Sequence, residues 1–273
     1  MGLRTDFYQP LVYSGLWFVD PAVIWSRDRR DVYLANVLRL PIEERRLEGR
    51  FDLGANLGQV GEVRVGAYRG LIRVRELLSV ASPLIDERRG GWYARFIHDR
   101  LDNLDFPTAG SFLEVEARLS RAALGAEEPY NRLEVRGARA LGGDRLACVL
   151  RGRAVGDLGS AIPFYDQPWL GGLGNLSGLD PAELQDDNLA MGSLTTLWRI
   201  GRLSPILGGN AYLGASLEAG GAWPRIGQVQ IDGMRLSAAA FLGVETIFGP
   251  LYLGWGWADE GQSSAYFQLG RIF

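Results

Sequence analysis

Long runs in which apolar and charged residues alternate with a period of two dominate this sequence. Alternate side chains of an extended strand point to opposite faces, so such a run predicts a β-strand with one apolar and one charged face. In residues 111–120 the apolar positions are Leu113, Val115, Ala117 and Leu119, and the charged positions are Glu114, Glu116 and Arg118. Residues 46–58 and 61–68 repeat the pattern, with polar positions at Glu48, Arg50, Asp52, Glu62 and Arg64.

About thirteen segments of this kind predict an all-β, antiparallel chain. We expect strands near residues 3–11, 16–33, 45–58, 61–76, 91–102, 110–121, 130–141, 144–155, 188–200, 210–220, 232–248, 250–258 and 264–273. Many are longer than the usual strand of about 5–6 residues, and about 9–11 tilted residues cross a bilayer. The best helical candidate is residues 73–85, which Pro83 cuts short. Residues 156–187 form a long connection rich in Gly, Pro and Asp, which predicts a functional loop.

Composition narrows the function classes. The 273 residues have a formal net charge of -3, which argues against nucleic acid as a partner. The single Cys148 excludes an internal disulfide and a multi-cysteine metal site, and the single His98 excludes a multi-histidine site. We expect no metal and no cofactor. The sequence has no run of 18 apolar residues and no signal peptide at its start, so we expect either a cytoplasmic protein or a chain that lacks its true N-terminus.

Alternation alone does not choose between a soluble β-sandwich binding module and a transmembrane barrel. Three features favour the barrel: apolar faces of mixed residue size, charged faces that carry Glu and Arg together, and Trp or Tyr near strand ends. The charged faces then line the lumen. The predicted lumen-facing residues are Glu48, Arg50, Asp52, Glu62, Arg64, Glu114, Glu116, Arg118 and Glu218.

Two stretches carry motifs of a known family. Residues 248–273 contain a GPL-x-L-x-x-G strand and a last strand ending L-G-x-x-F, through Gly249, Pro250, Leu251, Leu253, Gly256, Leu269, Gly270 and Phe273. Residues 99–116 contain Asp-Asn…Phe-Pro-Thr-x-Gly, through Asp102, Asn103, Phe106, Pro107, Thr108 and Gly110. Both resemble the Omp85 superfamily, also called the bacterial surface antigen D15 family. Residues 3–28 and 61–70 are similar to barrel strands of its patatin-linked branch, the type Vd secretion proteins.

The resemblance implies a sixteen-stranded outer-membrane barrel, of which residues 1–273 would be the C-terminal thirteen or so strands. About three strands, the periplasmic POTRA module and an N-terminal patatin-like passenger domain would be absent from this chain. Residues 156–187 would be the long extracellular loop that folds toward the lumen. The last strand, with Leu269, Gly270 and the terminal Phe273, would be the signal for the barrel-assembly machinery. Arg271 departs from the apolar residue that is common there.

The loop motif of the family is Val/Ile-Arg-Gly-Tyr/Phe, and its matching stretch here is Leu176, Ser177, Gly178 and Leu179. Ser177 replaces the arginine that in the family meets an acid on the inner wall. The resemblance therefore carries over a tight turn at Gly178 and an inward fold, but no charge pair. Glu218 is the candidate wall acid, without its usual partner. The alternative is a disordered, Gly-rich surface loop.

No enzyme motif is complete. The nearest nucleophile elbow, residues 214–218, has Glu218 in place of the second Gly, and Ser216 lies within a predicted strand without a following helix. His98 lies near a predicted turn, and residues 171–178 lack the Lys-Ser/Thr of a phosphate-binding loop. The sequence therefore predicts a non-catalytic outer-membrane translocator or anchor for a patatin-like passenger. Its partners would be membrane lipid, the assembly machinery, the fused passenger and possible second copies of the chain. The alternatives are a general Omp85 assembly or secretion pore, a barrel enzyme, and a porin.

Overall fold

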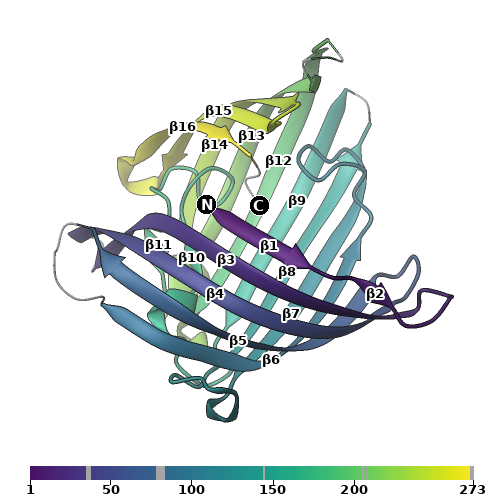
Figure 1. Ribbon diagram of the computed structural model, residues 1–273. Coiled ribbons are helices and arrows are strands. Elements are labelled where there is room, and N and C mark those ends of the chain that lie inside the picture. The colour runs from purple at the N-terminus through teal and green to yellow at the C-terminus, as the bar shows by residue number, and fades with distance from the viewer. Residues whose placement is uncertain (35–37, 78–83, 144, 205, 207, 271–273) are drawn as a thin grey trace. The chain divides into compact units, whose positions relative to one another are not determined.

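The computed structural model describes residues 1–34, 38–77, 84–143, 145–204, 206 and 208–270. These residues form antiparallel strands joined by turns, short 3-10 helices and one long loop (Figure 1). Along the hydrogen-bonded sheet the strand order is β1-β3-β4-β5-β6-β7-β8-β9-β12-β13-β14-β15-β16, and β2 also pairs with β3. Apart from β1, which adjoins β3, and the small β10-β11 pair, neighbouring strands of the sheet follow one another in the sequence, as antiparallel hairpin connections allow. The long loop joins β9 to β12.

The chain divides into two compact units. Unit 1 comprises residues 1–98, 113–135 and 155–167, and unit 2 comprises residues 99–112, 136–154 and 168–273. The first strands belong to unit 1: β1 (Gly2–Asp6), β2 (Gln9–Pro10), β3 (Trp17–Leu34), β4 (Leu38–Asn56), β5 (Glu62–Glu76) and nearly all of β6 (Ile85–Asp99). Three strands have residues in both units: β7 (Gly110–Ser120), β8 (Asn131–Gly142) and β9 (Leu146–Gly156).

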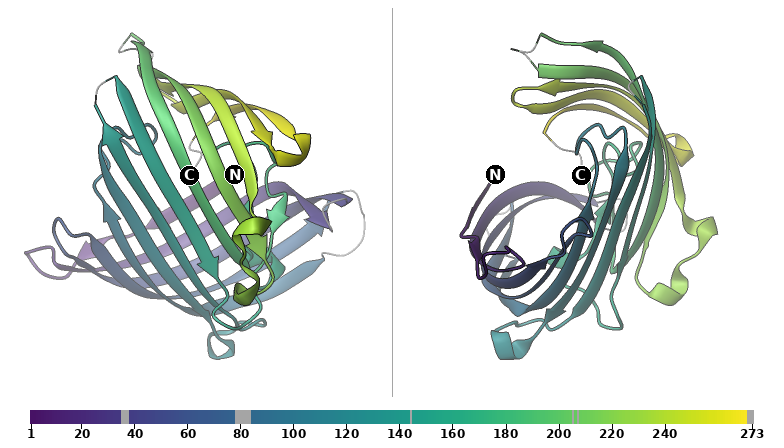
Figure 2. Two further views of the ribbon diagram at one scale, coloured as in Figure 1. Left: turned by 180° about the vertical axis from the view of Figure 1, so that it is seen from behind. Right: turned by 90° about the vertical axis from the view of Figure 1, so that its right-hand side faces the viewer.

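The later strands belong to unit 2, where β12 to β15 lie side by side (Figure 2). They are β10 (Trp169–Leu170), β11 (Leu184–Gln185), β12 (Asn188–Arg202), β13 (Gly208–Trp223), β14 (Arg235–Thr246), β15 (Gly249–Ala258) and β16 (Ser263–Leu269). Single-turn 3-10 helices lie in the connections: η1 (Ala122–Leu124), η2 (Phe164–Asp166), η3 (Ile226–Gln228), η4 (Ile231–Gly233) and η5 (Asp259–Gly261).

The order of the predicted strands is confirmed, with three corrections. The short strands β10 and β11 within residues 156–187 were not predicted. The expected strand at 3–11 is divided into β1 and β2, both paired with β3. The helical candidate at 73–85 is wrong where the structure describes it, because β5 continues to Glu76 and β6 begins at Ile85. Residues 78–83 of that candidate lie outside the described residues. The alternation of buried Ile72 and Val74 with exposed Arg73 favours the strand there.

The pattern of side-chain burial is the reverse of that in a soluble sheet, because charged side chains are buried and apolar ones are exposed. On β4, Glu48 is 1% exposed and its neighbour Leu47 is 47% exposed; on β7, Glu114 is 8% exposed and Leu113 is 38% exposed. A soluble sandwich would place the leucines inside. Within the described residues, no helix is long and apolar enough to span a bilayer.

Candidate functional site

The long loop between β9 and β12 lies partly in each unit and is held differently in the two. Its residues 157–167 belong to unit 1 and its residues 168–187 belong to unit 2. Four leucines of the second part are at most 4% exposed, at positions 170, 173, 176 and 179. The alternative of a disordered surface loop is therefore wrong for residues 170–179.

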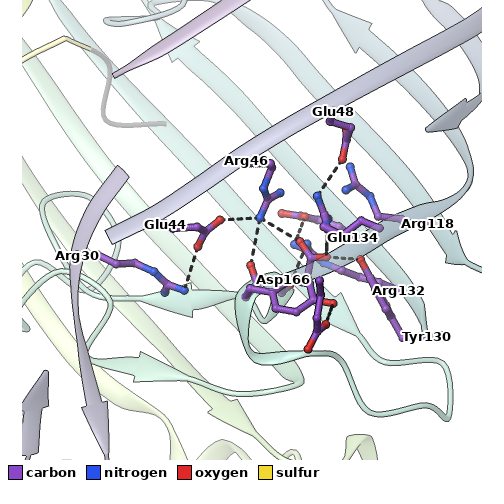
Figure 3. A network of polar contacts seen from close by, with 12 residues as sticks. Arg30, Glu44, Arg46, Glu48, Arg118, Tyr130, Arg132, Glu134 and Asp166 are labelled. Carbon is purple, nitrogen blue, oxygen red and sulfur yellow. Dashed lines mark hydrogen bonds and ion pairs between the residues drawn. The ribbon is translucent and has the colours of Figure 1, made fainter. Parts of the chain in front are cut away.

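In unit 1 the loop presents an acid, Asp166, to arginines of the strands (Figure 3). Asp166 ends η2 and is 5% exposed. One carboxylate oxygen accepts hydrogen bonds from Arg89 Nη2 at 2.5 Å and from Tyr130 Oη at 2.6 Å, and the other lies 3.3 Å from Arg46 Nη2. Three strand-side residues from different parts of unit 1 thus converge on one loop carboxylate.

A wider network orients these arginines. Arg89 also donates to Glu48 at 2.9 Å, and Glu48 accepts from Arg50 at 2.6 Å. The backbone of the loop takes part as well, because Arg46 donates to the carbonyl of Tyr165 and Arg132 donates to the carbonyl of Asp166, both at 3.2 Å. Side chains and backbone of the loop are therefore bound by the same set of guanidinium groups, which favours one fixed loop conformation.

Aromatic rings complete this network. The Arg89 guanidinium lies 5.8 Å from the ring centres of both Tyr68 and Tyr165, and that of Arg118 lies 5.1 Å from Tyr68. Tyr165 in turn donates to Glu87 at 2.8 Å. Cation–π contacts of this kind stabilise arginines that are withdrawn from water.

Burial and neighbouring charges shift the pKa values of three groups in and around the loop. Burial alone would raise the pKa of Asp166, but the charges of Arg89, Arg46 and Arg118 and the Tyr130 hydroxyl hold that pKa well below its usual range. Burial and the charge of Asp166 raise the pKa of Tyr130. Burial and the hydrogen bond to Glu87 likewise raise the pKa of Tyr165. Asp166 is therefore ionised, and both tyrosines are neutral donors, across the physiological range.

In unit 2 the loop presents donors to an acid of the strands. Glu218, on β13, is 3% exposed. Its two oxygens accept hydrogen bonds from the backbone N–H of Ser177 at 2.6 Å and from the Ser177 hydroxyl at 2.7 Å, and Ser216 adds a third at 2.6 Å. Glu218 therefore does have a partner in the predicted loop motif, although not a charged one.

The turn around Ser177 is fixed from several sides. Gly178 N–H donates to Ser237 Oγ at 2.7 Å, and Tyr266 Oη donates to the carbonyls of Ser177 and Leu179 at 2.7 and 2.9 Å. A Cβ on Gly178 would lie 2.1 Å from the backbone N of Ala258, so only glycine fits this approach to β15. The close approach to β15 is thus a steric reason for glycine at the predicted tight turn.

The predicted lumen-facing residues are withdrawn from solvent in the structure. Five of them are at most 8% exposed: Glu48, Asp52, Glu114, Arg118 and Glu218. The other four are partly exposed: Arg50, Glu62, Arg64 and Glu116. Most form ion pairs, such as Arg64 with Asp20 at 2.6 Å and Arg118 with Glu116 at 3.2 Å. Their assignment to a lumen stays a prediction.

The hairpin motif at 99–116 has a structural role in unit 2. Asp102 accepts from the backbone N–H of Thr108 and Ala109 at 2.9 and 3.0 Å, and Asn103 donates to Glu245 at 2.7 Å. Burial alone would raise the pKa of Asp102. The hydrogen bonds that it accepts from Thr108 and Ala109 outweigh burial and hold this pKa below its usual value. Phe106, 1% exposed, stacks on Tyr212 with ring centres 4.8 Å apart. The motif therefore closes a turn and fills a core.

The predicted C-terminal signal is described only in part. Leu269 ends β16 and is 58% exposed, and Gly270 follows with a φ of 105°. Phe273 lies outside the described residues. The role of these residues in assembly stays a prediction.

The candidate catalytic residues are engaged in other contacts. Ser216 donates to Glu218, and His98 Nδ1 lies 2.7 Å from the carbonyl oxygen of Val60. No group of three or more His, Cys, Asp or Glu among the described residues could hold a metal ion.

Comparison with protein families decides what this arrangement is. Residues 92–273 match the Omp85 superfamily domain. The chain belongs to the Omp85 superfamily. This finding, with the inverted burial, overturns the soluble β-sandwich alternative and the expectation of a cytoplasmic protein. The chain is an antiparallel β-barrel protein of the outer membrane. A search of curated proteins gave no match.

Solved structures agree with this fold. BamA from Haemophilus ducreyi lacking POTRA domains 1-3 aligns with a TM-score of 0.70 and 13% identity over 98% of this chain and 60% of that chain. CdiB from Escherichia coli aligns at 0.68 and 15% over 97% and 52%, and CdiB from Acinetobacter baumannii at 0.60 and 12% over 99% and 47%. The chain thus spans between about half and three fifths of these proteins.

The sequence did not predict the contacts of Asp166 with Arg89, Arg46 and Tyr130, which we call the unit 1 anchor. Asp166, Arg89 and Tyr130 are far apart in the sequence, and Asp166 lies in a loop where acids are common. The only signal in the sequence was an acid preceded by two aromatic residues, Phe164 and Tyr165, in a loop otherwise rich in Gly.

Proposed function

We propose that residues 1–273 are the C-terminal part of an outer-membrane barrel that acts as translocator or anchor for a passenger domain encoded upstream, without catalysis in this segment. The observation that supports the proposal is the inverted burial of β4 and β7, where Glu48 and Glu114 are buried and Leu47 and Leu113 are exposed. In a barrel of this superfamily, that pattern puts the charged faces against a polar interior and the apolar faces against lipid.

In this proposal the loop at 156–187 folds toward the lumen and obstructs it. The burial of Asp166 and Ser177, at 5% and 0% exposure, supports a loop that is bound rather than extended into solvent. Two separate anchors, one ionic and one neutral, would keep it in place until translocation requires its movement.

Conductance across a planar lipid bilayer tests the obstruction. We expect the wild-type protein to show small, intermittent currents, and a variant lacking residues 170–179 to show large, steady ones. Equal, large and steady currents from both would contradict the proposal and favour a porin. A matched deletion in a different turn, residues 225–233, controls for the loss of any extracellular segment.

The identity of the passenger is the finer part of the proposal. Resemblance of residues 3–28 and 61–70 to the patatin-linked branch supports a patatin-like domain followed by a POTRA module. Expression together with the upstream coding region, followed by protease treatment of intact cells and a phospholipase assay, tests it. An upstream region without a patatin domain would refute it.

A general Omp85 assembly or secretion pore is the second candidate. The likeness to the BamA and CdiB barrels favours it. Such a pore would act on a separate protein. Loss of surface exposure of a separately encoded substrate on deletion of this gene would support the pore over the fused anchor.

The proposal also gives the chain's contacts in the cell. The exposed apolar faces would contact outer-membrane lipid, and the last strand would be recognised by the barrel-assembly machinery. A second copy of the chain is a further partner to test by cross-linking in membranes.

Truncation of Phe273 should lower the amount of assembled barrel, measured by its migration in unheated detergent gels, while an unchanged amount would exclude the terminal aromatic as a signal.

A further inference from the structure

The exposed face of β3, β4 and β5 changes abruptly from apolar to basic along the strands. These three strands lie side by side in unit 1 (Figure 1). Trp25, Leu47 and Leu71 face one another across them in register, and their exposed fractions are 36%, 47% and 50%. The strands continue beyond this row toward the connections at 35–37 and 77–84, and Pro41 and Leu77 are the next apolar residues on this face.

The next two positions on the same face carry arginines, which we call the arginine rows. Arg27, Arg45 and Arg73 are opposite one another in the first row. Arg29 and Arg75 flank Glu43 in the second. Like charges directly opposite on neighbouring strands destabilise a sheet, so three arginines in one row call for a compensating anion.

The described residues supply only part of that compensation. Glu43, 4% exposed, accepts hydrogen bonds from Arg27 at 2.6 Å, from Arg45 at 2.8 Å and from Arg29 at 3.2 Å. Arg73 pairs with Asp86 at 2.6 Å. With Asp31, at the next position on this face of β3, three acids face five arginines, and the side chains of Arg27, Arg29, Arg45 and Arg73 remain 39–65% exposed. These eight described residues therefore leave an excess of two positive charges at the surface.

The position of the rows along the strand matches the edge of a bilayer. From Trp17 to Trp25 this face of β3 spans nine residues with exposed aromatic residues at both ends, and about 9–11 tilted residues cross the hydrocarbon region. Successive residues on one face are about 7 Å apart, so the arginine rows begin about 7 Å beyond the row of Trp25, Leu47 and Leu71. That is the depth of lipid headgroups.

We propose that the arginine rows bind the phosphate groups of a lipid headgroup in the surrounding membrane, while its acyl chains pack on Trp25, Leu47 and Leu71. Guanidinium groups bind phosphate through paired N–H donors, and two rows about 7 Å apart suit a headgroup with more than one phosphate. The fixed carboxylate of Glu43 holds three of the guanidinium groups in place before the lipid arrives. The inference rests on the membrane location and not on the passenger proposal.

Binding of a fluorescent diphosphorylated glucosamine lipid to the purified full chain in zwitterionic detergent tests this. We expect saturable binding that weakens as salt is raised, because partly exposed charges are screened. The triple variant R27Q/R45Q/R73Q should weaken binding at least tenfold. The matched control R100Q/R145Q/R225Q removes the same charge from three exposed turn residues and should change binding less than twofold.

Two further measurements keep the test decisive. The variant R27K/R45K/R73K preserves charge and sheet register, and it should bind more weakly than wild type but more tightly than the glutamine variant, which a loss of folding would not produce. Inorganic phosphate at 10 mM should not displace the lipid, since it lacks acyl chains. Equal binding by the glutamine and control variants, or displacement by inorganic phosphate alone, would overturn the proposal.

Discussion

The two halves of the long loop are held by opposite chemistry. In unit 1 the loop contributes the acid, Asp166, and the strands contribute the cations, Arg89 and Arg46. In unit 2 the strand contributes the acid, Glu218, and the loop contributes only the neutral donors of Ser177. An ionic anchor and a hydrogen-bonded anchor therefore act on one connection.

General energies of such contacts predict which one fixes the loop more firmly. Removing one member of a buried ion pair costs about 3–5 kcal/mol, whereas a hydrogen bond to a charged group contributes about 1.5–3 kcal/mol. Where the resemblance placed a charged contact, at position 177, the chain has the weaker one. The stronger contact lies eleven residues earlier in the sequence, where no motif indicated it.

The largest expected effect is that of Asp166→Ala. It leaves Arg89, 3% exposed, without one of its two carboxylate partners, so the free energy of unfolding should fall by about 3–5 kcal/mol. Urea unfolding followed by tryptophan fluorescence measures this. The control Asp232→Ala, an exposed acid in η4, should change stability by less than about 0.5 kcal/mol. A loss no greater than the control's would remove the ionic anchor from the comparison.

Ser177→Ala should have a smaller effect. It removes the hydroxyl that donates to Glu218 and that accepts from the backbone N–H of Gly174 at 2.8 Å, but it keeps the backbone donor to Glu218. We expect a loss of about 1.5–3 kcal/mol and faster protease cleavage within residues 170–179. Ser263→Ala, at an exposed position on β16, is the matched control. If Ser177→Ala cost more than Asp166→Ala, the order of the two anchors would be reversed.

Gly178→Ala tests the steric part of the unit 2 anchor. The new Cβ would meet the backbone of Trp257 and Ala258, so β15 or the loop must shift, at a cost of about 1–3 kcal/mol. Gly143→Ala, where a Cβ meets nothing within 4 Å, is the control. Equal unfolding midpoints for the two variants would show that the loop does not approach β15 so closely.

Acidification should weaken the unit 1 anchor with a predictable sign. Since the folded-state pKa of Asp166 is depressed, its contribution to stability is complete above the unfolded pKa of about 3.9 and is lost as the pH falls below that value. The stability difference between wild type and Asp166→Asn should therefore narrow between pH 7 and pH 3. A difference that widened on acidification would contradict an ionised Asp166.

The sequence predicts the strands well because alternation is a local property. The charges at Glu114 and Glu116 and the apolar residues at Leu113 and Val115 define a strand without reference to any distant residue. The ionic anchor depends instead on register across several strands and on the path of the loop, which no local pattern encodes. The arginine rows could not be predicted from the sequence for the same reason, because Arg27, Arg45 and Arg73 become neighbours only when β3, β4 and β5 pair.

The helical candidate at 73–85 shows the limit of short windows. Its leucines at 77 and 78 follow an arginine-rich strand end, and a few apolar residues near Glu76 mimic a helical face. Cross-strand pairing of Arg73 with Arg45 and of Val74 with Glu44 continues β5 to Glu76 instead. Tertiary pairing thus overrides local propensity there.

Accessibility of spin labels in lipid vesicles tests the central claim most directly. Single cysteines are introduced at Leu47, Glu48, Leu113 and Glu114 in a Cys148→Ser background, and each label is exposed to lipid-soluble oxygen and to a water-soluble nickel complex. The account predicts high oxygen accessibility at 47 and 113 and low oxygen accessibility at 48 and 114. Labels at 47 and 113 that neither reagent reaches, with labels at 48 and 114 open to the nickel complex from outside, would contradict it.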